Sequence, residues 1–260
     1  EPKIHAERIL ELVKLYNSDQ TSYYRSSELE AVIHKALNYW FTAKPVCLNW
    51  WYNQIGIPKT LGTVFILFEK QLSPVEKQNA ITVMENAKFG MTGQNKVWLA
   101  GNVMMRALLQ NDYELVKMAR DTIASEIVTG GVEGIKDDWC FHQHGAQQQF
   151  GNYGLSFVSG MSFFSGLFSG TSLAFDDKQL SILSALIDKG YRWVIWKGMM
   201  DVNALGRQLF HHAPVHKALS LAFAASELGG GESDECVAVA TALLRDDYPA
   251  PAVNVLTGHK

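Results

Sequence analysis

Apolar residues recur at helical spacing along nearly the whole chain. The first stripe contains Ile9, Leu12, Val13, Leu15 and Tyr16, and similar stripes follow with few interruptions. An apolar residue at every third or fourth position is typical of amphipathic helices that cover a common core. The spacing predicts helices over residues 9–16, 29–40, 57–70, 73–87, 96–109, 113–127, 152–169, 176–197, 213–228 and 234–245.

One helix start is marked by its sequence, and strand signals are scarce. In "SPVEKQNAITVMENA", Ser73 is a candidate N-cap, Pro74 takes the first helical position and Glu76 follows the serine by three residues. The only β-like run, "RWVIWKG" at 192–198, continues a helical stripe that begins at Leu180. The sequence therefore predicts an all-α protein of about ten helices joined by short turns.

Short turns between consecutive helices predict a series of helical hairpins, arranged as a bundle, a solenoid or a ring. No sequence motif repeats at a fixed period, which disfavours the solenoid. In a ring of hairpins, open or closed, the loops meet at one end. We expect the active surface at that end, because binding and catalytic residues concentrate in loops.

Composition is that of an ordinary globular protein and adds two limits. With 260 residues, of which 47% are hydrophobic and 19% charged, the chain can bury one large core, so we expect one domain over residues 1–260. The formal net charge of −3 gives no general basic field that would gather a nucleic acid. An anionic ligand must therefore be held by local groups.

Cysteine usage and hydropathy exclude further classes. Cys47, Cys140 and Cys236 are far apart and form no CxxC pair, which favours free thiols over a zinc knuckle or a disulfide framework. No run of about 18 apolar residues predicts a membrane span. The sequence opens directly on a helical pattern and ends at "PAPAVNVLTGHK" without a closing pattern. We expect it to be part of a longer protein.

Four segments carry polar and aromatic residues that helix formation does not explain, and we expect them to be loops. They are "NWWYNQIG" (49–56), "FGMTGQNK" (89–96), "CFHQHGAQQQFGNYG" (140–154) and "DVNALGRQLFHHAP" (201–214). Amides, aromatic rings and single cations in loops are better functional candidates than helix faces.

Nucleophilic catalysis and metal binding are weakly supported. Ser156, Ser159, Ser162 and Ser165 lie near His144 in sequence but on an apolar helix, and no GxSxG elbow is present. Cys140 precedes His144 by four residues without a known signature. His212 and His216 have the i, i+4 spacing of zinc ligands, but Pro214 stands between them and no HExxH pattern occurs. We predict no metal site.

A glycoside hydrolase on an α/α toroid would need two carboxylates, one as acid and one as base or nucleophile. Asp137 and Asp138 adjoin the histidine-rich segment, and Asp201 lies in another loop. Adjacent aspartates point in different directions and are typical of a solvated loop. This disfavours a hydrolase, which we keep as an alternative.

Asn95, His144, Tyr153 and Arg207 together suit β-elimination from a uronic acid. The proton beside a sugar carboxylate is removed only if the charge of that carboxylate is offset, and neutral donors such as Asn, Gln and His can do this by hydrogen bonding. A tyrosine can take the proton and return it to the leaving glycosidic oxygen. Free tyrosine has a pKa near 10, so a nearby arginine is needed to favour the phenolate.

At these residues the chain resembles polysaccharide lyase family 8, which contains chondroitin AC lyases, hyaluronate lyases and xanthan lyases. The segments "NWWYNQIGIPKTLG", "TGQNK", "HQHGAQQQFGNYG" and "DVNALGRQ" resemble the signature segments of that family in its order and rough spacing. Four ordered motifs are far more specific than any one of them. The resemblance spans residues 49–208, and the helical remainder fits as well.

The resemblance implies a role for each candidate residue. Asn95 and His144 resemble the pair that neutralises the uronate carboxylate, Tyr153 the general base and acid, and Arg207 the arginine that supports it. Predicted substrate-binding residues are Trp50, Trp51, Phe89, Gln143 and His211. Of these, Trp50, Trp51 and Phe89 resemble the aromatic patch that orients the polymer. His211 stands where family members commonly have a second arginine.

The resemblance also implies an architecture and its partners. The fold would be an incomplete α/α toroid, followed by a β-sandwich region that is absent from this chain. The supporting glutamate and any calcium site would belong to that region, so we predict no cofactor here and poor or no activity for this chain alone. We expect a secreted or periplasmic lyase acting on chondroitin or hyaluronan, with xanthan as the next candidate substrate. A carbohydrate-binding protein without catalytic activity is the other alternative.

Overall fold

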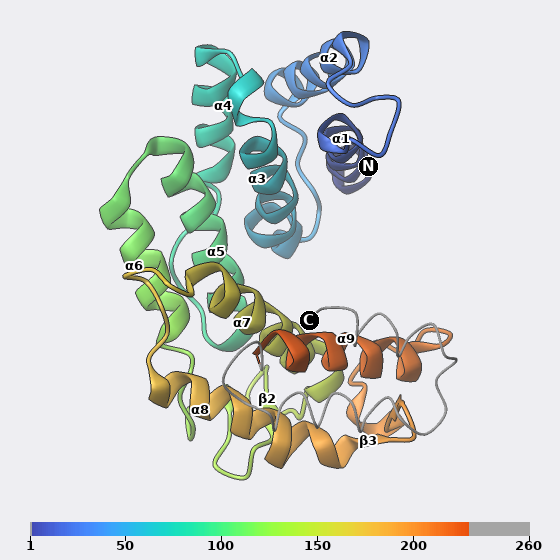
Figure 1. Cartoon of the computed structure of the whole chain (residues 1–260), viewed down its shortest axis with the longest axis vertical. Coiled ribbons are helices and arrows are strands. Elements are labelled where there is room, and N and C mark those ends of the chain that lie inside the picture. The colour runs from blue at the N-terminus through green and yellow to red at the C-terminus, as the bar shows by residue number, and fades with distance from the viewer. Residues whose placement is uncertain (1, 229–260) are drawn as a thin grey trace. The chain divides into compact units, whose positions relative to one another are not determined.

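The computed structural model describes residues 2–228. These residues form two compact units, 2–91 with 98–123 and 92–97 with 124–228. Figure 1 labels the α-helices of both units and two of their short strands. The predicted helix over 234–245 and Cys236 lie outside the described residues. The prediction of one domain over residues 1–260 stays a prediction.

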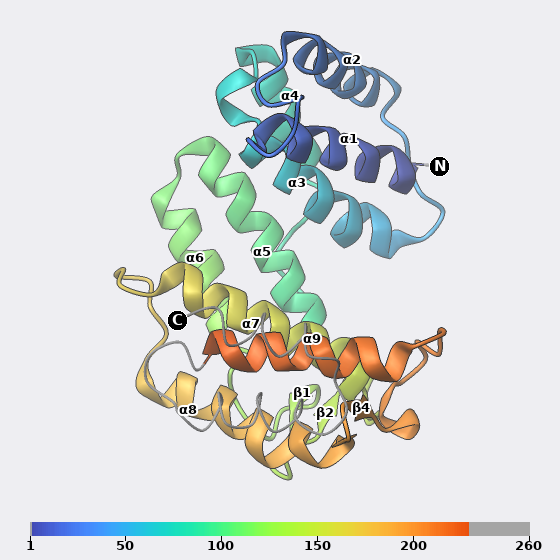
Figure 2. The same cartoon turned by 45° about the vertical axis from the view of Figure 1, so that its right-hand side comes forward.

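The first unit is a set of helices packed around an apolar core. Its elements are α1 (Pro2–Asn17), α2 (Ser27–Ala43), the π-helical turn η1 (Tyr52–Gly56), α3 (Ile57–Leu67), η2 (Glu69–Gln71), α4 (Pro74–Met84), most of α5 (Gly93–Gln110) and nearly all of α6 (Tyr113–Ala124). α1 packs along α3, which in turn contacts α4, as Figure 2 shows. Ile9, Leu37, Leu61, Phe65 and Phe68 are fully or almost fully buried between them.

The predicted capping box at the start of α4 is present. The Ser73 side chain accepts a hydrogen bond from the Glu76 backbone N–H, and the Glu76 carboxylate accepts from the Ser73 backbone (2.9 Å) and hydroxyl (2.8 Å). The same carboxylate lies 2.8 Å from Nδ1 of His34 on α2. Burial by itself would raise the pKa of Glu76, but the hydrogen bonds from Ser73 and His34 outweigh it and hold that pKa below its ordinary value.

Glu76→Gln is expected to lower the free energy of unfolding by about 1 kcal/mol at neutral pH, because it loses charge-assisted bonds at a helix cap. A depressed carboxyl pKa stabilises the fold above the unfolded-state value of 4.5, and this contribution is lost as the pH falls through the native value. The gap between wild type and variant should therefore close in acid, as urea unfolding from about pH 7 to pH 3 would measure. An unchanged gap would contradict the assignment. Glu7→Gln, in an exposed ion pair with Lys3, is the control.

The second unit holds the start of α5, then an irregular segment after α6, and then further helices. Its elements are strands β1 (Gly134–Ile135) and β2 (Phe141–His142), then η3 (Phe150–Gly154), α7 (Leu155–Phe168), α8 (Asp177–Ala185), η4 (Leu186–Gly190), η5 (Tyr191–Val194), β3 (Ile195–Trp196), β4 (Met199–Met200), η6 (Val202–Ala204) and α9 (Ala213–Leu228). β1 pairs with β2 and β3 with β4, both antiparallel. α7 and α9 lie side by side (Figures 1 and 2), and Ser162 donates to the carbonyl of Ala224.

The all-α prediction is confirmed for the described residues, whose strands are only two residues long. Two local predictions are wrong. The helix expected over 176–197 ends as α8 at Ala185, continues as the π-helical segment η4 and the 3-10 segment η5, and becomes strand β3, because Ile195 and Trp196 pair with β4. The loop expected over 49–56 is mostly helical, because η1 runs directly into α3.

Candidate functional site

Tyr153 lies in the π-helical turn η3, directly before α7. Single π-helical turns occur often at functional sites, because they redirect side chains that a regular helix would carry elsewhere. The residue is 5% exposed, so its ring is buried and its position is defined by packing. The predicted start of a helix at 152 is therefore close to the observed one, but the local geometry differs.

Glycines on both sides of Tyr153 allow other segments to approach it closely. A Cβ at Gly151 would lie 2.7 Å from Cα of Leu205, and a Cβ at Gly154 would lie 2.4 Å from the hydroxyl of Tyr191. The first approach brings the segment before Arg207 against η3. The second brings Tyr191 against η3, where its hydroxyl donates to the Phe150 carbonyl at 2.9 Å. Burial raises the pKa of Tyr191 well above its ordinary value.

His144 lies at the tip of a tight loop between β2 and η3. The Gln143 N–H bonds to the Gln147 carbonyl at 3.1 Å, and the Gln149 N–H bonds to the Phe141 carbonyl at 2.8 Å. His144 has φ 59° and Gly145 has φ 75°. A histidine in the left-handed region is uncommon and is retained only where its surroundings enforce it.

These elements bring His144, Tyr153 and Arg207 together. Nε2 of His144 lies 3.0 Å from the hydroxyl oxygen of Tyr153, with the two rings edge to face. Nη2 of Arg207 donates to the same oxygen at 3.0 Å. Because a guanidinium can only donate, the hydroxyl hydrogen can be donated to Nε2 of His144. The phenolic oxygen is thus held between a cation and an imidazole.

Asn95 lies in the first turn of α5, and its segment is joined to the histidine loop. The Gln94 N–H donates to Oε1 of Gln143 at 2.9 Å, and Gln143 directly precedes His144. Asn95 is 6% exposed, and its Oδ1 has no hydrogen-bond partner among the described residues. An amide left in this state is positioned to bind a ligand or a water molecule.

The remaining predicted binding residues differ in what they contact. The Gln143 amide is buried and committed to internal partners, since it also donates to the Thr92 carbonyl at 3.3 Å. His211 is exposed, with its ring centroid 3.7 Å from that of His212. In the first unit Trp51 packs edge to face on Trp98.

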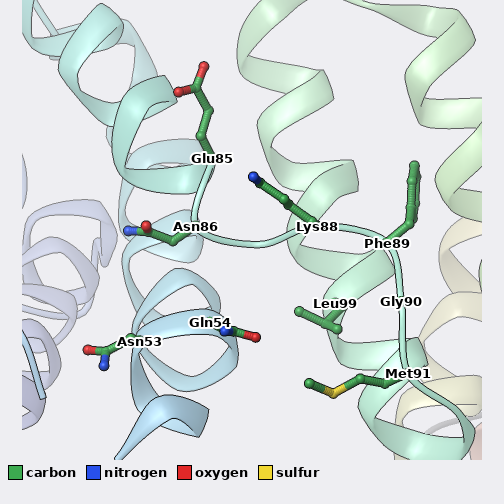
Figure 3. Close-up of a pocket in the computed structure, with 9 residues that line it drawn as sticks. All are labelled: Asn53, Gln54, Glu85, Asn86, Lys88, Phe89, Gly90, Met91 and Leu99. Carbon is green, nitrogen blue, oxygen red and sulfur yellow. The ribbon is translucent and has the colours of Figure 1, made fainter. Parts of the chain in front are cut away.

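The other two aromatic candidates are exposed. Trp50 is 46% exposed and Phe89 is 38% exposed. Phe89 belongs to the lining of a pocket of about 450 Å³, shown in Figure 3, between η1 and the segment that follows α4. Other lining residues include the polar side chains Asn53, Gln54, Asn86 and Lys88.

A comparison of the sequence with known families identifies the family of the chain. Residues 2–226 match the family described as "Polysaccharide lyase family 8, N terminal alpha-helical domain". The chain belongs to polysaccharide lyase family 8. This confirms the resemblance seen in the four motifs, and the helical domain so described agrees with the predicted fold class.

Individual relatives of this family 8 chain are lyases of differing names. It is 29% identical over 211 residues to chondroitinase-AC of Pedobacter heparinus, an alignment that covers 79% of this chain and 30% of the relative. It is 25% identical over 240 residues to the hyaluronate lyase HylB of Enterococcus faecalis, covering 81% of this chain and 24% of the relative. The Paenibacillus xanthan lyase structure matches with a TM-score of 0.85 at 21% identity, covering all of this chain and 27% of that one. The chain thus spans less than a third of the length of each of these proteins.

Three charged residues of the family 8 chain bond to the segments that carry the site residues, and no motif in the sequence marks them. Glu126 accepts from the Gly93 N–H at 2.7 Å and pairs with Lys96 at 2.9 Å, which fixes the start of α5. Glu133 contacts both the α5 start and the histidine loop. Lys217 is 5% exposed and donates to the Gly151 carbonyl and, at 2.7 Å, to Oε1 of Gln208, while burial lowers its pKa. A lone glutamate or lysine carries no motif, so no sequence signal could have found them.

The aspartates and the cysteine considered for hydrolysis and nucleophilic catalysis are engaged in local contacts. Asp138 accepts from the Cys140 N–H at 3.0 Å, which lowers the pKa of its carboxyl, and Asp201 accepts from the Asn203 N–H at 2.7 Å. Burial raises the pKa of the Cys140 thiol, which disfavours the thiolate. Residues 2–228 contain no group of three or more His, Cys, Asp or Glu placed to hold a metal ion. None of their helices is long and apolar enough to cross a bilayer.

Proposed function

We propose that this protein is a polysaccharide lyase that cleaves uronic-acid-containing polysaccharides by β-elimination. The observation that carries the proposal is the oxygen of Tyr153, held 3.0 Å from both Arg207 and His144. Chondroitin sulfate and hyaluronan are the favoured substrates, since the sequence relatives include a chondroitinase and a hyaluronate lyase.

Tyr153 acts as general base and then as general acid. As a phenolate it takes the proton from C5 of the uronate, the C4–O bond to the leaving sugar breaks and a C4=C5 double bond forms. The same proton then passes to the leaving glycosidic oxygen, so no water enters the products. Arg207 stabilises the phenolate, because a guanidinium donating to an oxygen favours its negative charge.

Asn95 and His144 neutralise the uronate carboxylate. Removal of the C5 proton places negative charge on that carboxylate, and preorganised neutral donors stabilise charge as it develops. The amide of Asn95 suits this task, because its Nδ2 carries two N–H donors and the group sits at a helix start, where backbone N–H dipoles favour an anion. The exposed faces of Trp50 and Phe89 offer apolar surfaces for sugar rings.

The geometry supports a lyase over a hydrolase and over a non-catalytic binding protein. A xanthan lyase of the same family would use the same residues on another polymer. An α/α-toroid hydrolase would need two opposed carboxylates, whereas Asp138 and Asp201 are engaged with the backbone of their own loops. A non-catalytic binding protein would not require an arginine and a histidine on one phenolic oxygen.

We further propose that the site is completed outside this chain. Its relatives are more than three times as long as the matched segment, which leaves room for a β-sandwich region. That region would supply a supporting glutamate and could hold calcium, and we propose no cofactor for this chain. Because such polymers are extracellular, the protein is expected to be secreted or periplasmic.

The decisive test follows ultraviolet absorbance of the new C4=C5 double bond when the intact protein is mixed with chondroitin sulfate, hyaluronan or xanthan. We expect absorbance to rise with one of the first two polymers, in step with released reducing ends. Reducing ends without absorbance would establish a hydrolase instead. Oligosaccharide binding without product over long incubation would establish a binding protein.

A further inference from the structure

The carboxylate of Glu133 bonds to two segments that are far apart in sequence. It accepts hydrogen bonds from the Thr92 hydroxyl at 2.5 Å, from the Gln143 side-chain amide, and from the Gly145 N–H at 2.9 Å. Thr92 lies three residues before Asn95, and Gly145 directly follows His144. One half-buried side chain therefore connects the turn that carries Asn95 to the loop that carries His144.

Gln143 completes this connection from the side of the loop. Its Oε1 accepts from the Gln94 N–H at 2.9 Å, and its amide nitrogen donates to Glu133 and to the Thr92 carbonyl. The contact is close, because a Cβ at Gly93 would lie 2.5 Å from Oε1 of Gln143. Glu133 thus fixes the orientation of the amide that bridges the two segments.

Glu133 also bears on the backbone of His144. That residue has φ 59°, a conformation that costs a non-glycine residue free energy and needs enforcing contacts. The bond from the Gly145 N–H to Glu133 fixes the peptide that joins His144 to Gly145. The Glu133 backbone is itself anchored, because the next residue begins β1, which pairs with β2.

We propose that Glu133 is a positioning residue that sets the spacing between the two groups that bind the uronate carboxylate, Asn95 and His144. The inference rests on the proposed function of those groups. Glu133 acts on those groups through Thr92, Gln143 and Gly145, to which its carboxylate is hydrogen-bonded. A displacement of about 1 Å in such a pair can cost up to about 100-fold in rate.

The test compares Glu133→Gln and Glu133→Ala with wild type in the intact protein. The glutamine keeps the shape and one acceptor oxygen, so we expect kcat to fall about 10-fold for Gln and about 100-fold for Ala. KM should change less than kcat, because the shift acts on charge that develops in the transition state. Hydrogen exchange of the peptide around Gly145 should accelerate in both variants, in the same order.

Asp176→Ala is the matched control. Asp176 caps α8 in the same unit and accepts from the Gln179 N–H at 2.8 Å, so its loss lowers stability through another carboxylate–backbone contact. We expect this variant to keep wild-type kcat and wild-type exchange at Gly145. A kcat for Glu133→Gln within twofold of wild type would overturn the positioning role.

The readouts separate failure of this inference from failure of the proposed function. If wild type forms no unsaturated product from any of the polymers, the lyase proposal fails. Hydrogen exchange at Gly145 that stays unchanged in the Glu133 variants would separately refute the positioning role of Glu133. If wild type is active and Glu133→Ala loses only thermal stability, the residue is merely structural and the positioning role is wrong.

Discussion

Tyr153→Phe is expected to lower kcat by about 100- to 10,000-fold, the range that general acid–base groups contribute. The substitution removes only the hydroxyl that takes and returns the proton. The ring is 5% exposed and should keep its packing, and Arg207 is exposed enough to be solvated when it loses its partner. Binding should therefore persist.

The measurement pairs initial rates of double-bond formation with calorimetric binding of an oligosaccharide to the same variant. We expect the dissociation constant to stay within a few-fold of wild type, since a group used mainly in the transition state affects kcat more than binding. A variant that turns over at near-normal rate would show that Tyr153 is not the base. A variant that fails to bind would show that the tyrosine serves recognition instead.

Asn95→Asp is the second large effect, with an expected loss in kcat of about 100- to 1,000-fold, comparable to removing an oxyanion-hole donor. The side chains have nearly the same shape, but the aspartate places a negative charge where the uronate carboxylate must bind. Fold stability should fall modestly, because the side chain at this position is 6% exposed and burial of a carboxylate costs desolvation, which the helix dipole offsets only in part.

Asn95→Ala separates the donor from the charge. It removes the amide without adding repulsion, so we expect a smaller increase in KM than for aspartate together with a similar loss in kcat. Thermal unfolding of both variants checks that α5 is intact. Equal turnover for aspartate and wild type would contradict the assignment, because a carboxylate cannot neutralise a carboxylate.

Much of the helical framework could be predicted from the sequence because helix signals are local. The stripe beginning at Ile9 and the Ser73–Glu76 cap each depend on residues within a few positions of one another, and both are observed. The segment after Ala185 could not be predicted in the same way. Its apolar residues suit a helix or a strand, and pairing with β4 decides the outcome.

The candidate site, like the helical framework, could be predicted from the sequence only in part. Motif spacing along the chain pointed to Asn95, His144, Tyr153 and Arg207, but spacing alone places no atom of one segment next to another. Only the tertiary structure brings Arg207 to the phenolic oxygen, through a close approach that Gly151 permits. It likewise shows that Gln143, predicted to bind substrate, is engaged with internal partners.

The sequence by itself determined the fold class, the family and the residues that suit its chemistry, because helical periodicity and the four motifs are properties of neighbouring positions. The tertiary structure alone decided which charged residues support those groups. Glu133 and Lys217 look like solvated side chains in the sequence, since hydrogen bonds to distant backbone leave no local pattern. Their contacts exist only where the folded chain brings separate segments within hydrogen-bond distance.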